Sequence, residues 1–478
     1  MVSSEAVPFS KSGGLADVVT SLSQALVGLD NDVRLIVPCY GSTDDSLFTI
    51  TSMRLSVVLQ GGDETVEIKQ LRFLGVECYF IVHPWFTARK GIYGDTSFTP
   101  YADNFLRFLL LAKVPQLLCA ALDWHPDILH CHDWTAGLVP FLAKRDTSGV
   151  FAQTKSVFTI HNLAYQGDFP RFDVLMGAME VDPRMLSGAG IHQRLNMLKT
   201  GLEFADLITT VSPTYAKEIQ TVEHGCGLSA LLKARSSQLH GILNGIETQE
   251  WGPLTDPFLD IHFSSEDLSG KFQLKSAVQK RFGLAVDAEV PLISMISRIA
   301  EQKGFVELCQ GTPCALEQIL TELPVQVLII GTGDKAIEEK LTALGELHPN
   351  LSVNLIFSNA AAHLVEAGSD FFLMPSRYEP CGLNQMYSLR YGTIPIARNT
   401  GGLSDSIIDC DEDSEQGTGI LFSEMSGKAI FEAVSRAMKH FRQGPTHMLP
   451  IRTRGMKVDF SWRQSAQEYL RIFKGSKG

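Results

Sequence analysis

Short apolar runs alternate with helical patterns along nearly the whole chain, and this alternation restricts the fold more than any other feature. In the first half the runs are 33–37, 76–82, 128–130, 156–160, 207–211 and 241–243, and residues 1–6 read as the end of an earlier one. They are brief, β-branched and apolar on both faces, as in parallel strands covered by helices. Apolar residues at helical spacing predict helices over 17–29 and 101–121. The βαβα order predicts a doubly wound α/β fold.

The same order starts again after a polar stretch. Residues 248–268 are rich in Pro, Asp and Ser, which indicates a linker. Apolar runs follow at 292–296, 325–330, 351–357, 371–374 and 394–397. Since 478 residues exceed the usual size of one core, we predict two Rossmann-like domains facing a deep cleft, residues 1–248 and 249–461. A terminal helix within 462–478 is expected to pack back on the first domain.

Composition excludes several kinds of partner. The net charge of −12 does not suit a general nucleic-acid binder, because the phosphate backbone attracts a basic surface. We expect no membrane partner, since no apolar run approaches the roughly 18–20 residues of a membrane span and no leader pattern precedes the first strand. The acidic surface suits a neutral polymer and leaves room for a local basic site.

The cysteines and the histidine-rich run at 130–133 do not predict a metal site. The nine cysteines are scattered without paired spacing, as expected for reduced, buried thiols in a cytosolic protein. His130-Cys131-His132-Asp133 contains ligand types, but neighbours on a strand point to opposite faces and no second cluster has ligand spacing. We therefore expect no metal there.

Two similar segments, Gly13-Gly14-Leu15-Ala16-Asp17 and Gly401-Gly402-Leu403-Ser404-Asp405, each stand between a strand signal and a helix signal. Glycine pairs let a ligand approach the backbone, and the helix start behind them offers N–H groups and a positive dipole end. We interpret both pairs as candidate contacts for phosphate. The alternative is that both are only tight strand-to-helix turns.

Positive charge near strand ends suits a diphosphate leaving group. Arg298 and Lys303 follow the run 292–296, at the end where ligands of such sheets bind. A planar Arg and a long Lys both hold diphosphate, which gathers negative charge as a glycosidic bond breaks. Lys11, just before Gly13, has a similar position. For Arg298 and Lys303, a solvated surface pair is the alternative.

The segment from Met374 to Leu383 is unusual. A buried run ends at Met374, two prolines bracket a tight turn, and a helix is predicted over 383–391. Glu379 therefore stands on a rigid turn just ahead of a helix. It is a candidate to hold a sugar or to stabilise positive charge at an anomeric carbon. The alternative is a carboxylate that only caps the helix.

Polar residues also follow two runs in the first half. His132-Asp133-Trp134 and His161-Asn162 come after 128–130 and 156–160, at the same edge of the predicted sheet. Histidine can hydrogen-bond a sugar hydroxyl. A lone histidine is more often structural, but two such clusters on one edge favour a binding site.

Several segments in a fixed order carry a family resemblance. They are K-S-G-G-L-A-D-V at Lys11, H-C-H-D-W-T-A-G-L at His130, T-I-H-N-L-A-Y-Q-G at Thr159, I-L-N-G-I-E at Ile242, S-R-I-A-E-Q-K-G at Ser297, P-S-R-Y-E-P-C-G-L-N-Q-M at Pro375, R-Y-G-T-I-P at Arg390 and T-G-G-L at Thr400. In this order they resemble the bacterial glycogen synthases and plant starch synthases, which are retaining glucosyltransferases of the GT-B type.

The resemblance implies an activity and its partners. Glucose would pass with retention from ADP-glucose to the non-reducing 4-hydroxyl of an α-1,4-glucan (glycogen, starch or malto-oligosaccharides), releasing ADP. The acceptor would bind the first domain and the donor the second, with no metal or other cofactor. The location implied is the cytoplasm for a bacterial source and the plastid for a plant or algal one, and a homo-oligomer stays open.

The resemblance also assigns residues. Arg298 and Lys303 would hold the diphosphate. Glu379 would hold the donor glucose near its 3- and 4-hydroxyls, and His161 would act near the anomeric centre. Asn244 would shape the cleft, and main-chain N–H groups at 383–384 and 401–402 would meet phosphate. The substrate contacts implied are Lys11, Gly13, Gly14, Asp17, Asp133, Asn162, Asn244, Phe357, Cys381, Gly382, Leu383, Asn384, Thr400, Gly401 and Gly402.

Two segments depart from the family pattern. Phe357 stands where many relatives carry Tyr, so the ring that would stack on adenine is kept and its hydroxyl is lost. Residues 221–227 (T-V-E-H-G-C-G) lack the family's commoner Pro and aromatic residue, which leaves the acceptor contacts open.

The expected mechanism is front-face transfer after domain closure. Closure would expel water, and the acceptor 4-hydroxyl would attack on the face from which the nucleotide leaves. No second carboxylate flanks Glu379, so a covalent intermediate is not expected. Three alternatives remain: a UDP-glucose-using transferase of the same fold, a glucan phosphorylase, and a non-catalytic glucan-binding paralogue.

Overall fold

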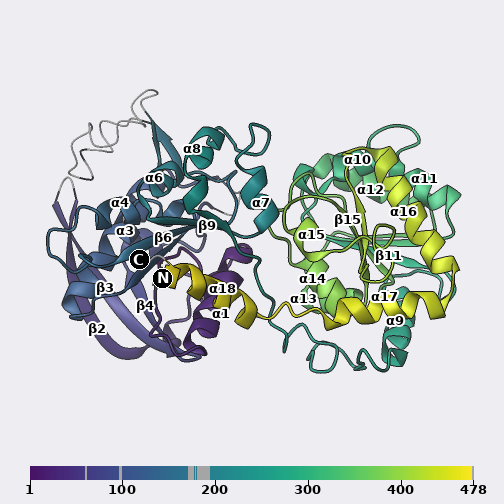
Figure 1. Ribbon diagram of the computed structural model, residues 1–478, viewed down its shortest axis with the longest axis horizontal. Helices are drawn as coiled ribbons and strands as arrows, with labels where there is room; N and C mark the ends of the chain where they lie inside the picture. The colour runs from purple at the N-terminus through teal and green to yellow at the C-terminus, as the bar shows by residue number, and fades with distance from the viewer. Residues whose placement is uncertain (60–61, 96–98, 171–176, 178, 180–193, 476–478) are drawn as a thin grey trace. The chain divides into compact units, whose positions relative to one another are not determined.

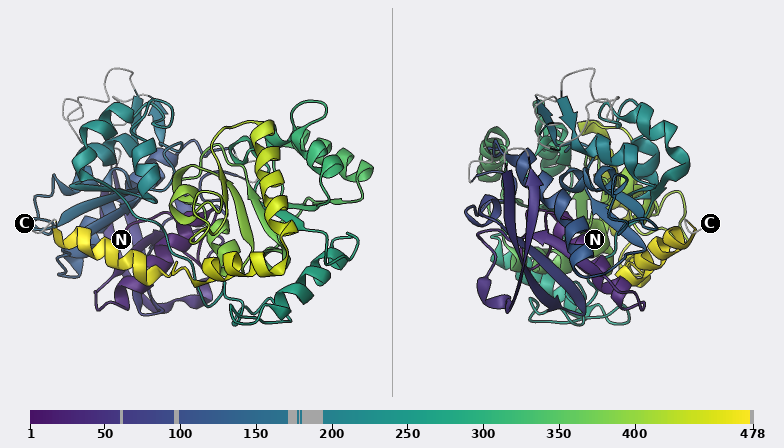
Figure 2. Two further views of the ribbon diagram at one scale, coloured as in Figure 1. Left: turned by 45° about the vertical axis from the view of Figure 1, so that its right-hand side comes forward. Right: turned by 90° about the vertical axis from the view of Figure 1, so that its left-hand side faces the viewer.

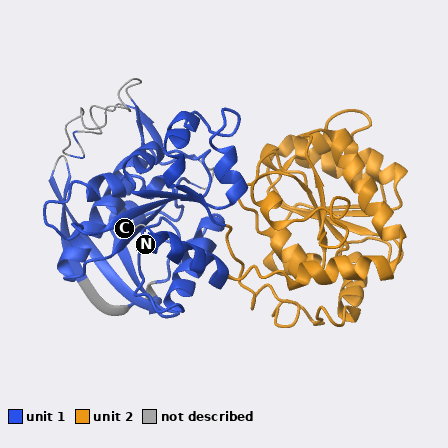
Figure 3. Ribbon diagram, viewed as in Figure 1, with its two compact units in different colours: residues 1–242, 462–478 blue, residues 243–461 orange. Residues whose placement is uncertain are grey.

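The computed structural model describes residues 1–475 except 60–61, 96–98, 171–176, 178 and 180–193. The chain forms two compact units (Figure 3). Unit 1 contains residues 1–242 and 462–478, and unit 2 contains residues 243–461. The division falls after Ile242, a few residues before the predicted boundary at 248.

Unit 1 is built on one sheet whose two halves are joined by the first residues of the chain. The mutually parallel strands are β1 (Arg34–Pro38), β4 (Val76–Val82), β5 (Ile128–His132), β6 (Lys155–Ile160), β9 (Leu207–Thr210) and β10 (Leu239–Gly241). Two four-stranded arrays run in the orders β1-β4-β3-β2 and β10-β9-β6-β5. Val2 bridges in parallel to both Ile36 of β1 and Cys131 of β5. The strand order therefore reverses at Val2, which makes this point the switch point of unit 1.

An antiparallel extension of this sheet was not predicted. Strands β2 (Thr49–Leu59) and β3 (Gly62–Phe73) pair antiparallel, and β3 pairs antiparallel with β4. The pair lies at one edge of the unit in the right-hand view of Figure 2. Only alternate residues such as Val66 and Ile68 are buried, because the other face of the strand is more open. A search for continuously apolar runs misses strands of this kind.

The helices of unit 1 cover the sheet and include the terminal helix. They are α1 (Gly14–Val27), α2 (Pro84–Thr87), α3 (Asn104–Ala121), α4 (Val139–Ala143), α6 (Met197–Phe204), α7 (Pro213–Glu218), α8 (Ser229–Ala234) and α18 (Trp462–Gly475), with 3₁₀ turns η1 (Asp45–Leu47), η2 (Trp134–Ala136) and η5 (Ser236–Gln238) and a small ribbon of β7 (Asp168–Pro170) and β8 (Arg194–Asn196). Helix α18 lies beside α1 (Figure 1). Leu22 of α1 and Tyr469 of α18 share one core cluster, so the terminal helix packs on unit 1.

Helix α3 corrects one expectation from composition. By length and apolarity alone it could cross a membrane, whereas no stretch of that kind was expected. However, 67% of it is buried inside the unit. The buried guanidinium of Arg107 donates to the carbonyl oxygens of Trp85 and Ile92, at 2.9 and 2.8 Å. These contacts are those of a core helix.

Unit 2 contains a six-stranded parallel sheet in the order β13-β12-β11-β14-β15-β16. The strands are β11 (Leu292–Ile296), β12 (Gln326–Ile330), β13 (Leu351–Asn354), β14 (Phe371–Met374), β15 (Ile394–Arg398) and β16 (Ile420–Phe422). Each of the five predicted runs contains a strand, although the run 351–357 is a strand only as far as Asn354, and β16 is an addition. Ile293 and Leu292 belong to different core clusters, so both faces of the sheet are buried. The order reverses between β11 and β14, which is the switch point of unit 2.

Helices surround this sheet on both faces. They are α9 (Ser269–Arg281), α10 (Phe305–Cys309), α11 (Ala315–Glu322), α12 (Lys335–Leu347), α13 (Asn359–Gly368), α14 (Asn384–Arg390), α15 (Gly401–Ser406), α16 (Gly427–Arg442) and α17 (Pro445–Lys457), with a 3₁₀ turn η6 (Glu301–Lys303). The residues that follow β11 lead into η6, and those that follow β14 lead into α14.

The interpretation of residues 248–268 as a linker was wrong. Leu259 is buried in a core cluster of unit 2. The indole of Trp251 stacks between the rings of His363 and Tyr387, with centroid distances of 3.6 and 3.8 Å. The Pro- and Asp-rich composition reflects irregular backbone, but the segment packs as part of unit 2.

Candidate active site

The loops that follow β11 and β14 are joined at the switch point of unit 2. β11 leads into residues 297–304, and β14 leads into residues 375–383. The N–H of Arg377 donates to the carbonyl oxygen of Gln302 at 2.8 Å. The side-chain amide of Gln302 donates to the carbonyl oxygen of Tyr378 at 3.3 Å. The loop predicted to carry cations therefore binds directly to the loop predicted to carry the carboxylate.

Lys303 and Glu379 form a close ion pair on these loops. Nζ of Lys303 lies 2.5 Å from Oε2 of Glu379, and the Ser376 hydroxyl donates to the same oxygen at 3.0 Å. The Glu379 side chain is 8% exposed. Its other oxygen, Oε1, has no hydrogen-bond partner in the part of the chain that the structure describes. This carboxylate is neutralised on one side and open to accept a hydrogen bond on the other.

Glycine is required beside Lys303. Gly304 has a φ of 79°, in the left-handed region, and a Cβ there would lie 1.9 Å from the carbonyl oxygen of Pro375. Only glycine allows the two loops to approach this closely. The approach brings the ammonium of Lys303 to Glu379.

The second glycine pair supports the Glu379 turn by contact with its backbone. A Cβ on Gly401 would lie 2.0 Å from the carbonyl oxygen of Glu379, and one on Gly402 would lie 2.0 Å from that of Cys381. The N–H of Gly402 donates to the Glu379 carbonyl oxygen at 3.1 Å. That N–H is therefore not available for the phosphate contact expected of it. Thr400, buried at the start of α15, precedes the pair.

The residues after Glu379 close the turn and start α14. Burial raises the pKa of the Cys381 thiol to about 12, against a hydrogen bond from the main chain of Asn244. A thiol of this kind stays neutral and is a poor nucleophile. Gly382 is left-handed, with a φ of 72°. Leu383 precedes the helix, and the side-chain amide of Asn384 donates to the last carbonyl oxygen of β11 at 2.8 Å.

Three further side chains in unit 2 differ in how open they are to a ligand. Arg298 is exposed and has no ion-pair partner among the described residues. Arg377, by contrast, is held by Glu301 and by Glu307, the latter at 2.5 Å. The ring of Phe357 is 96% exposed just beyond β13. Arg298 and Phe357 are thus open to a ligand, while Arg377 serves the protein.

In unit 1, a buried carboxylate organises the loop before α1. Glu5 is 2% exposed. It accepts hydrogen bonds from the Ser12 hydroxyl at 2.7 Å, the Tyr93 hydroxyl at 2.5 Å and the Gly13 N–H at 3.4 Å. The N–H of Ser12 also donates to it. The Glu5 carboxylate therefore accepts hydrogen bonds from some of the main-chain N–H groups that were expected to bind phosphate.

The rest of this loop is open. A Cβ added to Gly13 or Gly14 would meet no atom within 4 Å. The Lys11 ammonium pairs with Asp17 at 2.8 Å, and these side chains are 53% and 33% exposed. An ion pair this exposed contributes only ~0–1 kcal/mol to stability, so Lys11 can leave Asp17 and bind a ligand instead.

Asp133 and His161 are joined on the neighbouring loops of unit 1. Asp133 has a φ of 57° and a ψ of −177°, a conformation rare outside glycine. Its Oδ1 accepts the N–H of His161 at 2.8 Å. Burial raises the pKa of Asp133 to about 7, opposed by main-chain N–H groups of His161 and Asn162. The Asn162 side chain accepts a local hydrogen bond from the N–H of Ala164 at 3.0 Å.

The ring of His161 lies against a second histidine. Its Nε2 is 3.0 Å from Nδ1 of His132 at the end of β5. Burial lowers the pKa of His161 to about 3. The imidazole is therefore neutral at pH 7, so it is able to form hydrogen bonds but does not carry a positive charge.

Some site residues were not found from the sequence. Ser376 lies inside the conspicuous Pro375–Leu383 segment, so its position was a usable signal. Glu5 and Tyr93 gave no such sequence signal, because they are distant in sequence and come into contact only in the folded chain. Each predicted residue of unit 2 lies on or beside the two joined loops except Phe357, which lies just beyond β13.

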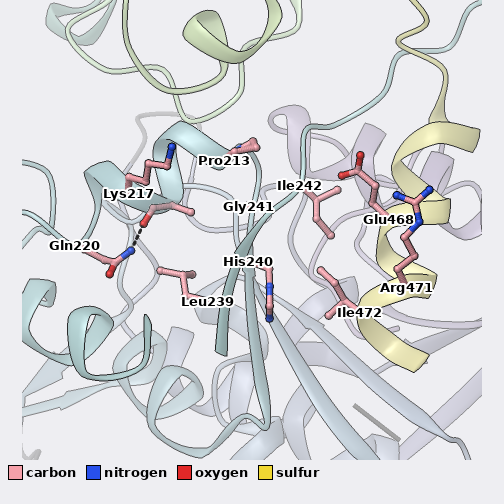
Figure 4. A pocket seen from close by; sticks show the side chains of 11 residues that line it. Pro213, Lys217, Gln220, Leu239, His240, Gly241, Ile242, Glu468, Arg471 and Ile472 are labelled. Carbon is pink, nitrogen blue, oxygen red and sulfur yellow. Dashed lines mark hydrogen bonds between the residues drawn. The ribbon is translucent and has the colours of Figure 1, made fainter. Parts of the chain in front are cut away.

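A depression elsewhere in unit 1 is separate from these residues. Its volume is about 440 Å³, and residues from α7, β10 and α18 line it (Figure 4). Lys217 stands on one side, with Glu468 and Arg471 on the other. None of the predicted site residues lines it, so it is not assigned to the candidate active site.

Two doubly wound units, each with polar side chains at its switch point, define a glycosyltransferase of GT-B architecture. Residues 1–234 match the family described as "Starch synthase catalytic domain", and residues 278–442 match "Glycosyl transferases group 1". The chain is 39% identical to a glycogen synthase of Treponema denticola over 99% of this chain and 97% of that protein. It is 43% identical to one of Myxococcus xanthus, over 99% and 98%.

Comparison with solved structures gives related proteins as well. The catalytic domain of starch synthase IV from Arabidopsis thaliana, bound to ADP and acarbose, superposes with a TM-score of 0.88 and 32% identity, covering 99% of this chain and 98% of that one. A sucrose-phosphate synthase from Thermosynechococcus elongatus, with a TM-score of 0.58 and 17% identity, shares the fold alone. The chain therefore belongs to the glycogen and starch synthase family and is a glucosyltransferase of glycogen or starch synthesis.

Proposed function

We propose that this glucosyltransferase takes its glucose from ADP-glucose and adds it, with retention, to the non-reducing 4-hydroxyl of an α-1,4-glucan. The plant relative holds ADP and acarbose, a nucleotide and an oligosaccharide analogue, which supports this pair of substrates. The observation that carries the proposal is the Glu379 carboxylate, neutralised at one oxygen by Lys303 and open at the other.

Unit 2 supplies the donor site in this proposal. Arg298, exposed and without an ion-pair partner among the described residues, binds the diphosphate together with the ammonium of Lys303. The Arg298 guanidinium offsets the charge that the leaving diphosphate gathers, and the Lys303 ammonium, which is shared with Glu379, donates a further hydrogen bond to it, so no metal is required. The exposed ring of Phe357 stacks on the adenine.

Glu379 holds the donor sugar and does not attack it. Its free Oε1 accepts hydrogen bonds from the glucose 3- and 4-hydroxyls. Its charge is already balanced by Lys303 at 2.5 Å, which reduces its strength as a nucleophile. The acceptor hydroxyl therefore attacks directly on the leaving-group face, and the departing phosphate takes its proton.

Unit 1 supplies the glucan site. Asp133, Asn162 and the neutral ring of His161 lie on two adjacent loops at one edge of its sheet. Lys11 and the open Gly13-Gly14 loop lie at the switch point of the same sheet. These groups hydrogen-bond neutral sugar hydroxyls, which suits a protein of net charge −12.

The test offers glycogen with labelled ADP-glucose or labelled UDP-glucose, with and without EDTA. Label is expected in the polymer from ADP-glucose, in α-1,4 linkage, and EDTA is expected to have no effect. Label from UDP-glucose alone would replace the donor assignment. If neither label enters the polymer, the proposal fails.

Variants test the site itself. Glu379→Gln and Lys303→Met should each lower the rate at least about a hundredfold, as loss of one transition-state contact does. Lys428→Met, at an exposed position of α16, is a matched control that should keep full activity. Near-normal rates in the first two variants would remove Glu379 and Lys303 from the mechanism.

A further inference from the structure

Three imidazoles form a row inside unit 1. His130 and His132 lie on β5, with exposed fractions of 2% and 0%, and their ring centroids are 4.1 Å apart. The ring of His161 follows, 5.3 Å from that of His132. Nδ1 of His132 and Nε2 of His161 are 3.0 Å apart, so one of these two nitrogens carries the proton of the hydrogen bond when both rings are neutral.

The surroundings of His132 decide which nitrogen that is. Nε2 of His132 is sealed from solvent and has no hydrogen-bond partner among the described residues. If His161 donated, the proton of His132 would sit on that nitrogen as a buried N–H without an acceptor. If His132 donates from Nδ1, its Nε2 carries no proton and only a lone pair is left without a partner. Orphaned buried N–H groups are the rarer and more costly of the two.

We propose that His132 is a positioning residue that donates from Nδ1 to Nε2 of His161 and thereby fixes the proton of His161 on Nδ1. Burial lowers the pKa of both rings, so the neutral forms persist at pH 7. Nδ1 of His161 points away from His132 and is not among the sealed, unpaired atoms of the described chain. His161 therefore presents an N–H donor to its ligand.

The main chain of His161 is held by the residue that directly follows His132. Oδ1 of Asp133, the residue next to His132, accepts the N–H of His161 at 2.8 Å. His132 and Asp133 together fix both the backbone and the ring of His161. The donor they create suits an oxygen acceptor such as a sugar hydroxyl, and this identity of the ligand rests on the proposed function.

His130 provides a matched control. Its Nδ1 is also sealed and without a partner among the described residues, and its Nε2 lies 2.6 Å from the Thr159 hydroxyl. Thr159 in turn lies 2.6 Å from the Thr209 hydroxyl. By the same reasoning His130 donates to Thr159, along a path that makes no hydrogen bond to His161. His130→Phe therefore removes an equally buried imidazole and leaves the His132–His161 bond in place.

The test reads the tautomer of His161 by ¹⁵N NMR of the full chain, labelled in the histidine rings and without substrate. The His161 signals are assigned by their loss in His161→Gln. We expect Nδ1 protonated in the unmodified protein and in His130→Phe. In His132→Phe the signal should shift toward Nε2–H, the form that free histidine prefers, and His132→Asn, whose amide can donate from the Nδ1 position, should restore Nδ1–H.

The outcomes separate this inference from the proposed function. An Nε2–H signal in the unmodified protein overturns the proposal, and Nδ1–H that persists in His132→Phe removes His132 from it. Neither reading depends on substrate or turnover, so a failed donor assay does not affect them. With the substrates proposed above, kcat/KM should fall roughly tenfold in His132→Phe, the worth of one hydrogen bond, and recover in His132→Asn.

Discussion

Replacement of Lys303 tests whether Glu379 is held as a charged and nearly buried group. The side chains are 21% and 8% exposed, and the charged atoms are 2.5 Å apart. Removing one partner of a fully buried pair costs ~3–5 kcal/mol, whereas an exposed pair contributes ~0–1 kcal/mol. Since Lys303 is partly exposed, we expect Lys303→Met to lower the free energy of unfolding of unit 2 by ~2–3 kcal/mol.

A double-mutant cycle isolates the charge effect. Glu379→Gln keeps an acceptor for the Ser376 hydroxyl and should cost ~1–2 kcal/mol. In that background Lys303→Met strands no buried carboxylate, so its further cost should fall to ~1 kcal/mol. The expected coupling between the two sites is therefore ~1–2 kcal/mol, within the range for residues in direct contact.

The cycle is measured by hydrogen exchange across a urea series, in peptides from unit 2, so that unfolding of unit 1 does not enter the result. The control is the Lys428–Glu432 pair on α16, at 3.7 Å and with side chains 80% and 61% exposed. Its coupling should not exceed ~0.5 kcal/mol. Additive effects at Lys303 and Glu379, like those of the control, would refute the reasoning.

Three further predictions follow from single contacts. Gly401→Ala should lower the stability of unit 2 by ~2–4 kcal/mol in thermal melts, because the φ is left-handed and the Cβ meets a carbonyl oxygen, whereas Gly14→Ala should stay within about 0.5 kcal/mol. The carboxyl of Asp133 titrates near a pKa of about 7 when folded and 3.8 when unfolded. Its contribution to stability is therefore full below the lower value and lost as pH rises through the higher one. Asp133→Asn should remove that part of the pH dependence of the melting temperature, and an unchanged profile would contradict the buried carboxyl. Trp251→Ala should destabilise unit 2 by ~2–4 kcal/mol, since its ring is stacked on both faces, and a neutral effect on unit-2 hydrogen exchange would return the segment to the status of a linker.

The fold was largely predictable because most strands are buried on both faces. The run 371–374 and the run 292–296 coincide with β14 and β11. A buried parallel strand must be apolar at successive positions, so its signal is local and strong. β3 was not predicted because its outward residues, such as Glu67 and Lys69, are polar. Only the period-two pattern around Val66 and Ile68 indicates this strand.

The site was predictable only where its residues lie at strand ends. Lys303 and Glu379 follow β11 and β14, and the sheet order brings those ends together. Glu5 is different, because residues 1–6 were interpreted only as the end of a strand, and that local pattern does not indicate what the Glu5 side chain contacts. Only the fold brings Tyr93 to it and buries its carboxylate. Contacts of this kind depend on long-range packing, for which the local pattern carries no signal.

The two glycine pairs show why a shared motif does not imply a shared role. Both precede a helix after a strand, and both were interpreted as phosphate contacts. At Gly401 and Gly402 an added Cβ would strike the carbonyl oxygens of the Glu379 turn, so glycine is required there by the protein itself. At Gly13 and Gly14 an added Cβ meets no atom within 4 Å, so the protein places no such demand. The space beside the first pair is open to a ligand, and the first pair is therefore the better candidate for direct substrate contact.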